Sequence, residues 1–460
     1  MADETAGTME TLPKASAWDT LAALAEIFVP TLSKGVIIRR PKVTKLAERM
    51  DLNRRAVRRM QKLRAKYGEG PLLMSLAGRT HALILSPEHV HRVLEETPEP
   101  FSPASSEKRA ALAHLEPKAS LISEGPKRTE RKNFNEEVLE ARKDVHPLAD
   151  HFATVVEQEM TVLLEAARDQ GELTWDLFAQ AWYAMVRRVV LGDSARDDHD
   201  LTDMLAKLRG AANWAFMHPG HDKVLDSFHQ RVDEYLERAE PGTLAAVIAR
   251  TPKTADTAPS HQIAHWMFAF DPGGMATIRA LALIVTHPEQ GERAYGEIAE
   301  LWSQGKKNLP FLRACILESL RLWSTTPVVL RESRQDTLWP MGKMEKDTSI
   351  VIFAPFFHRD DQNLAYADRF YPDLWLQGQR EGGWPLIPFS GGSGICPARN
   401  LVPMLGSMVL ATLLQGRRFA LKDPAKLDPA QPIPGSLDNY TLRFLVQEGG
   451  QARERDLPSQ

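Results

Sequence analysis

The stretch Pro388-Phe-Ser-Gly-Gly-Ser-Gly-Ile-Cys396-Pro-Ala-Arg399 decides the fold of this chain of 460 residues. In it, a cysteine stands just ahead of a proline, and proline often opens a helix. Behind it, apolar residues recur at helical spacing, at Met404, Leu405, Met408 and Val409. We therefore expect a last helix from about Pro397 to Gln415. The positive end of its dipole should lower the pKa of the Cys396 thiol and favour the thiolate.

Three glycines, Gly391, Gly392 and Gly394, come shortly before the cysteine. Because they lack side chains, the backbone can approach a flat ligand closely and turn N–H groups toward the sulfur. Phe389 is placed to lean on the same ligand. A cysteinate axial ligand to heme iron requires this arrangement. The alternative interpretation of Cys396 is a small buried hydrophobic residue.

The pattern Phe389-x-x-Gly392-x-x-x-Cys396-x-Ala398 resembles the heme-binding loop of the cytochrome P450 family. The resemblance extends over roughly residues 70–450 and implies a mainly α fold with small β-sheets. It makes Cys396 the axial ligand to the iron of heme b. It also implies that Phe389, Gly392, Gly394 and Ala398 contact the cofactor.

A second motif supports the first. Glu318-Ser-Leu-Arg321 resembles the family's Glu-x-x-Arg, and Arg369 resembles the arginine that completes its ion-pair network. A Glu–Arg pair three residues apart is in general only a surface contact on a helix. In this ordered set of motifs we expect a buried structural network.

The heme carboxylates need cations, and the family often places Arg or His where this chain has Gly394. By resemblance, Arg331 occupies another position that contacts these carboxylates. Arg128 and Arg131 match a helix that supplies a further contact. Each of the three is otherwise an ordinary solvated charge.

In the family, a helix that crosses the heme carries an acid followed by threonine, which help deliver protons to bound dioxygen. Aligning on His287-Pro288 places Asp271 at the acid position and Pro272 at the threonine position. Proline has no hydroxyl and breaks a helical hydrogen bond, so the helix should open and expose a carbonyl or hold a water. A second alignment makes Thr277 the threonine and loses the acid. The competing interpretation of Asp271 is an Asp-Pro turn.

The rest of the chain predicts one large helical domain, residues 21–460, after a loose tail over residues 1–20. Residues 72–76 and 81–85 predict a hairpin, and Ser86-Pro87 the start of a helix. We expect substrate contacts from residues 101–122 and 211–225. Apolar residues there lie either in the pocket or in the core, namely Leu115, Trp214, Phe216 and Met217.

Residues 42–66 are strongly basic, and Leu46, Met50, Val57, Met60 and Leu63 suit one buried helix face. This stretch is either a docking face for an acidic partner or membrane surface, or a solvated helix face.

Composition excludes several classes of protein. The formal net charge of −3 argues against a dedicated nucleic-acid binder. The two cysteines rule out a disulfide framework or zinc finger, and Cys315 should fill the core. No N-terminal targeting signal and no apolar segment of membrane-spanning length is recognisable, so we expect a cytoplasmic protein.

The implied activity is that of a monooxygenase, which inserts one oxygen atom from O2 into a small organic substrate. The electrons come from a ferredoxin or a flavoprotein reductase. Three alternatives stay open. In the first, Pro272 at the threonine position marks a peroxide-dependent enzyme, or one that couples or rearranges its substrate. The second is a non-catalytic heme sensor or carrier, and the third is a heme-free scaffold.

Overall fold

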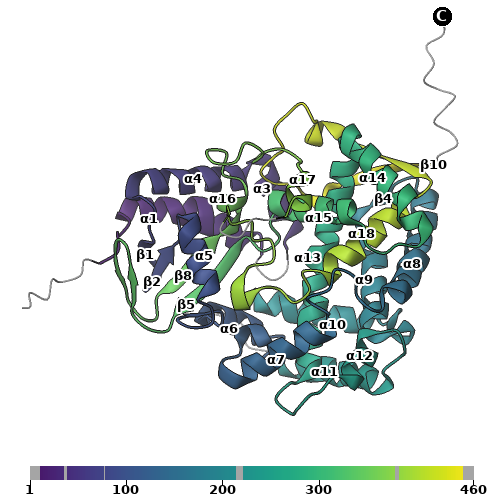
Figure 1. Cartoon of the computed structure of the whole chain (residues 1–460), viewed down its shortest axis with the longest axis horizontal. Helices are drawn as coiled ribbons and strands as arrows, with labels where there is room; N and C mark the ends of the chain where they lie inside the picture. Colours follow the sequence, from purple (N-terminus) through teal and green to yellow (C-terminus); the bar gives the residue numbers. More distant parts are fainter. Residues whose placement is uncertain (1–10, 36–38, 77, 214–220, 379–382, 449–460) are drawn as a thin grey trace, which may run out of the picture.

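The fold is described from a computed structural model of the chain, which covers residues 11–35, 39–76, 78–213, 221–378 and 383–448. Helices dominate this part of the chain (Figure 1). They are α1 Ala17–Ala23, α2 Val29–Ser33, α3 Pro41–Arg49, α4 Leu52–Tyr67, α5 Pro87–Glu95, α6 Ser106–Leu112, α7 Gly125–Val138, α8 Ala149–Gln170, α9 Trp175–Leu191, α10 His199–Ala212, α11 Asp222–Arg238, α12 Leu244–Arg250, α13 Pro259–Thr286, α14 Pro288–Glu300, α15 Pro310–Leu322, α16 Ala354–His358, α17 Asp373–Leu376 and α18 Leu401–Leu414.

The strands form small sheets, as the resemblance implied. They are β1 Leu72–Leu76, β2 Arg79–Leu83, β3 Phe101–Ser102, β4 Leu173–Thr174, β5 Val328–Ser333, β6 Thr337–Trp339, β7 Gly342–Met344, β8 Ser349–Phe353, β9 Arg417–Leu421 and β10 Arg443–Glu448. The largest sheet has the order β1-β2-β8-β5-β3. The predicted hairpin is confirmed, because β1 pairs antiparallel with β2. The helix start is confirmed too, since Ser86 Oγ accepts a hydrogen bond from the His89 amide at the beginning of α5.

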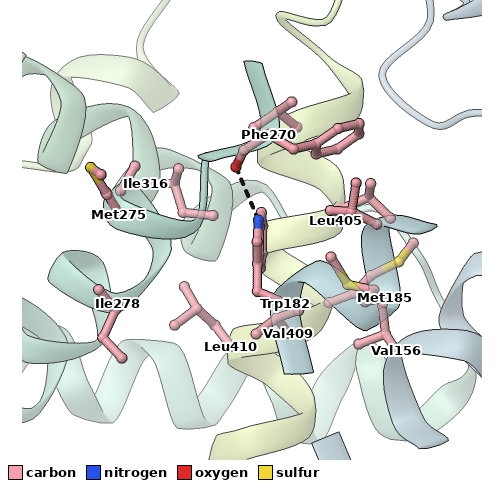
Figure 2. Packing of buried hydrophobic residues seen from close by; sticks show 14 of the residues in the cluster. Val156, Trp182, Met185, Phe270, Met275, Ile278, Ile316, Leu405, Val409 and Leu410 are labelled. Atoms are coloured by element: carbon pink, nitrogen blue, oxygen red, sulfur yellow. Dashed lines mark hydrogen bonds between the residues drawn. The ribbon is translucent and has the colours of Figure 1, made fainter. Parts of the chain in front are cut away.

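The helical part is built around α13, which has 28 residues and packs against α9, α15 and α18. Figure 2 shows Trp182 of α9 enclosed by Ile316 of α15 and by Leu405, Val409 and Leu410 of α18. In the part of the chain that the structure describes, α13 alone is long and apolar enough to span a membrane. The expectation that no segment reaches this length is therefore wrong. With 78% of its most apolar window buried inside the protein, α13 is a core helix.

The predicted loose tail is also wrong for residues 11–20. Leu12 is buried, and the Ala15 amide donates a hydrogen bond of 2.9 Å to the Leu73 carbonyl of β1. Helix α1 then begins at Ala17, where Ser16 caps it. This segment packs against the β1–β2 hairpin, a tertiary contact that its polar composition does not reveal.

The basic stretch 42–66 forms two helices, α3 and α4, because Asp51 adopts a positive φ of 45° between them. The predicted single apolar face is therefore split, and Leu46 and Met50 are exposed while Val57, Met60 and Leu63 are buried. Several of its cations pair with carboxylates from other segments: Arg54 with Asp368, Arg59 with Glu26, Arg64 with Asp360, and Lys66 with Asp19. These pairs attach α4 to the rest of the fold.

Candidate functional site

The cysteine loop folds back on itself before α18. The Cys396 amide donates a hydrogen bond of 3.0 Å to the Phe389 carbonyl, and the Ile395 amide donates one of 3.1 Å to the Gly392 carbonyl. Residues 397–400 form a turn, so α18 begins at Leu401 rather than at Pro397. The sulfur therefore lies ahead of the helix and does not cap it.

The environment of the sulfur differs from the expectation. Burial raises the pKa of the Cys396 thiol, while the Ala398 N–H and the Arg399 charge act in the opposite direction. The predicted lowering of this pKa is wrong, because desolvation disfavours the thiolate more than these groups favour it. A cation bound at the sulfur would reverse the balance.

Two of the three glycines make room for neighbouring protein groups, which differs from the predicted close approach to a flat ligand. A Cβ on Gly392, whose φ is +57°, would lie 1.8 Å from the Leu94 carbonyl oxygen of α5. A Cβ on Gly394 would lie 2.4 Å from Nη2 of Arg331. Gly392 thus lets the loop cross α5, and Gly394 makes room for a guanidinium group. The N–H group found at the sulfur belongs to Ala398, which is buried.

Three cations, Lys108, Arg128 and Arg331, gather beside this loop. Arg331 donates to Thr97 Oγ1 at 2.9 Å and to Ser390 Oγ at 3.2 Å, and Arg128 donates to the Ser393 carbonyl at 2.8 Å. Lys108 donates to the carbonyls of Pro103 and Leu330, both at 3.0 Å.

This group carries positive charge that the protein does not neutralise. Among the described residues, none of these cations forms a salt bridge. Burial lowers the pKa of Arg331 to about 10, with Arg128 adding to the effect, and it lowers the pKa values of Arg128 and Lys108 as well. Buried charges need counterions. The two carboxylates of heme, next to a cysteine sulfur, supply this negative charge, so the residues present fit that cofactor.

Arg331 and Arg128 thus both contact the cysteine loop, and Lys108 is an additional cation that sequence reasoning missed. Arg131 does not join them. Its guanidinium binds the Asp256 carbonyl at 2.7 Å and Ser123 Oγ at 2.6 Å, so it fastens the segment before α13. The prediction that Arg131 binds the cofactor is therefore wrong.

The Glu318–Arg321 pair is buried, as predicted. Glu318 and Arg321 have 0% side-chain exposure and share two hydrogen bonds of 2.7 and 2.8 Å. Arg321 also donates to the carbonyls of His358 and Ala367. The network joins α15 to the segment after α16 and so supports the region that precedes the cysteine loop.

Arg369 does not have the predicted side-chain role. Its side chain is exposed, and its contribution to the network is the backbone carbonyl, which accepts from Arg321 at 2.8 Å. The remaining donors to Glu318 are the Tyr371 amide at 2.8 Å and Trp375 Nε1 at 2.9 Å. An indole thus stands where a third charged side chain was expected.

Helix α13 accommodates Pro272 without ending. Pro272 cannot donate to the Phe268 carbonyl, and two residues later the Phe270 carbonyl accepts a hydrogen bond of 2.9 Å from Trp182 Nε1, as Figure 2 shows. Gly273 and Gly274 face the indole, and a Cβ on Gly274 would lie 3.0 Å from Trp182 Nε1. The expected opening of the helix at Pro272 is not observed, because α13 runs from Pro259 to Thr286, and the Phe270 carbonyl is bonded to a tryptophan side chain.

Asp271 directly precedes Pro272 in α13, and both of its carboxylate oxygens accept hydrogen bonds. Tyr183 donates to Oδ1 at 2.6 Å, and Arg209 donates to Oδ2 at 2.6 Å. Burial raises the pKa of Tyr183, with the Asp271 charge adding to it, so the phenol stays protonated. Asp271 is therefore a buried, ion-paired carboxylate, which no Asp-Pro surface turn would provide.

The other pocket candidates are placed as follows. Thr277 Oγ1 donates to the Gly273 carbonyl at 2.9 Å and faces α18, where a Cβ on Gly406 would lie 2.6 Å from it. Leu115 is fully buried in the main hydrophobic core. Trp214, Phe216 and Met217 lie outside the described residues.

In the described ranges, no group of three or more His, Cys, Asp or Glu side chains is arranged to bind a metal ion. Cys315 is buried on α15, and burial raises its pKa well above the usual value, as core filling predicts. The site's donor set is thus one sulfur with carboxylate-binding cations beside it, which suits a cofactor that brings its own metal and acid groups.

Comparison with known proteins agrees with this geometry. The family model "Cytochrome P450" matches residues 260–439. "Probable cytochrome P450 4s3" of Drosophila melanogaster is 29% identical over 199 residues, which are 42% of this chain and 40% of the relative. Cheilanthifoline synthase of Eschscholzia californica is 23% identical over 57% of this chain and 61% of its own length. The chain thus spans less than two thirds of these relatives.

Two solved structures share the fold. A retinoic acid-bound cyanobacterial CYP120A1 superposes with a TM-score of 0.67 at 15% identity, over 84% of this chain and 93% of the other. The heme domain of cytochrome P450DA gives a TM-score of 0.68 at 17% identity, over 88% and 94% of the two chains. Fold, cysteine loop, buried Glu–Arg pair and sequence similarity thus all agree with the cytochrome P450 family, whose model matches residues 260–439.

Proposed function

We propose that the protein is a heme-thiolate monooxygenase that inserts one oxygen atom from O2 into a small organic substrate. The second oxygen atom leaves as water, which requires two protons and two electrons from a separate ferredoxin or flavoprotein reductase. The observation that carries the proposal is the half-buried Cys396 in a loop that has the unneutralised cations Lys108, Arg128 and Arg331 beside it. Heme b, when bound, supplies the oxygen chemistry.

The protein's own part at the sulfur is to hold a thiolate in a half-buried loop. The Ala398 N–H stabilises the negative charge, and Arg399 adds a nearby positive charge. The carbonyl–amide bond between Phe389 and Cys396 fixes the sulfur's position in the loop. Arg331 and Arg128 bind the cofactor's acid groups and so set its orientation.

The residues that deliver protons are Asp271, next to Pro272 in α13, and its partners Tyr183 and Arg209. Asp271 is a buried carboxylate directly before Pro272, which stands at the threonine position. Its Oδ1 accepts a hydrogen bond from the Tyr183 hydroxyl, which is a proton donor. Release of Arg209 from Oδ2 would free the carboxylate to carry protons from the solvent side. Asp271 thus acts as a relay, and the ion pair with Arg209 sets how readily it works.

One observation favours a second function, oxidation driven by hydrogen peroxide. Pro272 supplies no hydroxyl, and both oxygens of Asp271 are already bonded. Peroxide already contains the two electrons and two protons that O2 requires, so it makes a proton relay dispensable.

One experiment tests both. The heme-loaded protein is supplied with NADPH, ferredoxin, ferredoxin reductase and isotopically heavy dioxygen, and a parallel sample receives unlabelled hydrogen peroxide alone. The monooxygenase proposal predicts a product that contains one heavy oxygen atom. Turnover with peroxide alone, and none with O2 and electrons, would replace it by the second function. No product from any compound of a broad substrate panel by either route would reject both.

A further inference from the structure

A second group of cations, two of them buried and one half-buried, lies apart from the one beside the cysteine loop. It consists of Lys34 after α2, Arg39 before α3 and Arg279 on α13, and we call it the distal cation group. Arg39 donates to the Gly35 carbonyl at 2.7 Å and to the Thr325 carbonyl. Arg279 donates to the Trp323 carbonyl at 3.5 Å, so two of these guanidinium groups converge on the segment that follows α15.

The charges of this group are not neutralised. In the ranges that the structure describes, none of the three side chains forms a salt bridge, and Lys34 donates to a neutral acceptor, Asn53 Oδ1, at 2.7 Å. Burial lowers the pKa of Lys34 to about 7, and the charges of Arg39 and Arg279 lower it further. Burial, followed by the charge of Arg39, lowers the pKa of Arg279 to about 10.

The carboxylates in the vicinity are engaged elsewhere. Asp438 accepts the Tyr440 amide at 3.1 Å. Glu48 accepts the Asp438 amide at 3.2 Å and pairs with Lys426 at 3.4 Å. They weaken the positive potential at Arg279 without contacting it, so the group retains an excess of positive charge.

Unpartnered donors point to a ligand at this place. Arg279 is 92% buried, since its exposed fraction is 8%, and its Nε has no hydrogen-bond partner. Asn439 Nδ2 and Ser436 Oγ, in the loop that Arg279 contacts, are also buried and unpartnered. A buried donor without a partner costs about 1–3 kcal/mol, so a bound acceptor group would stabilise all three.

Asp271 and Tyr440 lie within electrostatic range of this group. The charge of Asp271 acts on Arg39 and on Tyr440, and Arg39 and Arg279 act on Tyr440, which places these residues around one region. The cations beside the cysteine loop act on one another and not on the distal group. The cofactor's acid groups account for the first group and leave the second without an anion.

We infer that Lys34, Arg39 and Arg279 bind the carboxylate of an anionic substrate beside the segment that follows α15. The inference rests on the proposed function, whose substrate class it narrows to organic acids. A planar carboxylate matches the forked donors of two guanidinium groups. Binding of the carboxylate would also offset the repulsion among these three cations.

The test compares acids with neutral molecules of the same length. Hexanoic, decanoic and hexadecanoic acids and their primary alcohols are titrated into the heme-loaded protein, with binding followed by calorimetry and by the heme absorption spectrum. We expect at least one acid to bind about tenfold or more tightly than its alcohol, because hydrogen bonds to charged groups contribute more than neutral ones. Equal affinities for acid and alcohol throughout the panel would overturn the inference.

Variants locate the effect. Arg39→Gln should weaken binding of the acid about tenfold or more and leave binding of the alcohol unchanged. The affinity of Arg39→Lys for the acid should lie between those of the native protein and Arg39→Gln. Arg49→Gln, at an exposed arginine of α3, is the matched control and should change neither. If Arg39→Gln loses the same affinity for acid and alcohol, Arg39 has a structural role and the assignment is refuted.

The failure of this inference is distinct from that of the proposed function. The spectrum of the reduced protein with carbon monoxide reports thiolate ligation before any acid is added. A protein with that spectrum but no preference for acids keeps the proposed function and loses the distal anion site. If calorimetry shows preferential binding of acids by a protein without that spectrum, the distal anion site stands and the proposed function is rejected.

Discussion

Replacement of Glu318 by glutamine tests the network that supports the cofactor loop. Glu318 and Arg321 have 0% side-chain exposure, and the carboxylate is the only counterion bonded to Arg321 among the described residues. Breaking a buried pair by neutralising one partner costs about 3–5 kcal/mol. A native protein has a total stability of about 5–15 kcal/mol, so Glu318→Gln should lose about a fifth or more of it.

Two further variants separate the donors of the network. Trp375→Phe removes the bond from Nε1 to Glu318 but keeps the ring, and it should cost about 1.5 kcal/mol, the low end for a charged acceptor, because Trp375 is half-buried. Arg369→Ala removes an exposed side chain and keeps the carbonyl that accepts from Arg321, so its cost should be about 0.5 kcal/mol or less.

The assay is equilibrium unfolding in urea, followed by circular dichroism, for the heme-loaded form of each variant and of the native protein. The expected order of destabilisation is Glu318→Gln, then Trp375→Phe, then Arg369→Ala. An Arg369→Ala variant as unstable as Trp375→Phe would show that the guanidinium does complete the network. A Glu318→Gln variant of native stability would refute the role of the buried pair.

Further predictions concern the site itself. Gly392→Ala should prevent stable cofactor binding, because its Cβ would lie 1.8 Å from the Leu94 carbonyl oxygen; a native ratio of heme to protein absorbance would contradict this. Arg331→Gln should weaken retention of heme about tenfold or more, measured as transfer to apomyoglobin, and unchanged transfer would remove Arg331 from the cofactor site. Asp271→Asn should slow product formation and divert electrons to peroxide; unaltered coupling of NADPH to product would exclude the relay. Because the pKa of the Cys396 thiol is raised, alkylation of the cofactor-free protein by iodoacetamide should be slow at pH 7 and increase above about pH 9, whereas rapid labelling at pH 7 would disprove the buried environment.

The parts of the site that could be predicted from the sequence are those with local signals. Cys396 and Gly392 lie within one short loop, and Glu318 and Arg321 are three residues apart on one helix. Such spacings fix which side chains are neighbours before tertiary structure is known. The hairpin at Leu72–Leu83 and the start of α5 follow the same rule, since turn and capping residues act over a few positions.

The remainder depends on tertiary contacts. Arg128 and Arg131 are one turn apart, yet one faces the cysteine loop and the other the segment before α13. The pKa of Cys396 depends on burial, which residue spacing does not reveal. Arg39 and Arg279 are 240 residues apart in the sequence, so their convergence has no sequence signal.

The contact of Trp182 with α13, near Pro272, likewise has no signal in the sequence. Pro272 removes the helical donor to the Phe268 carbonyl, but the carbonyl that accepts a hydrogen bond from an indole is that of Phe270. The residue that binds this carbonyl comes from α9, almost ninety positions earlier. Neither the indole nor the matching Gly274 stands out in the sequence.

The central claim is that Cys396 is the thiolate ligand of a heme. The measurement that tests it most directly is the absorption spectrum of the purified, heme-loaded protein, reduced and exposed to carbon monoxide, beside that of Cys396→Ala. We predict the strongly red-shifted band of thiolate-ligated heme in the native protein and its loss in the variant. A heme spectrum without this band in the native protein, or the same band in Cys396→Ala, would contradict the claim.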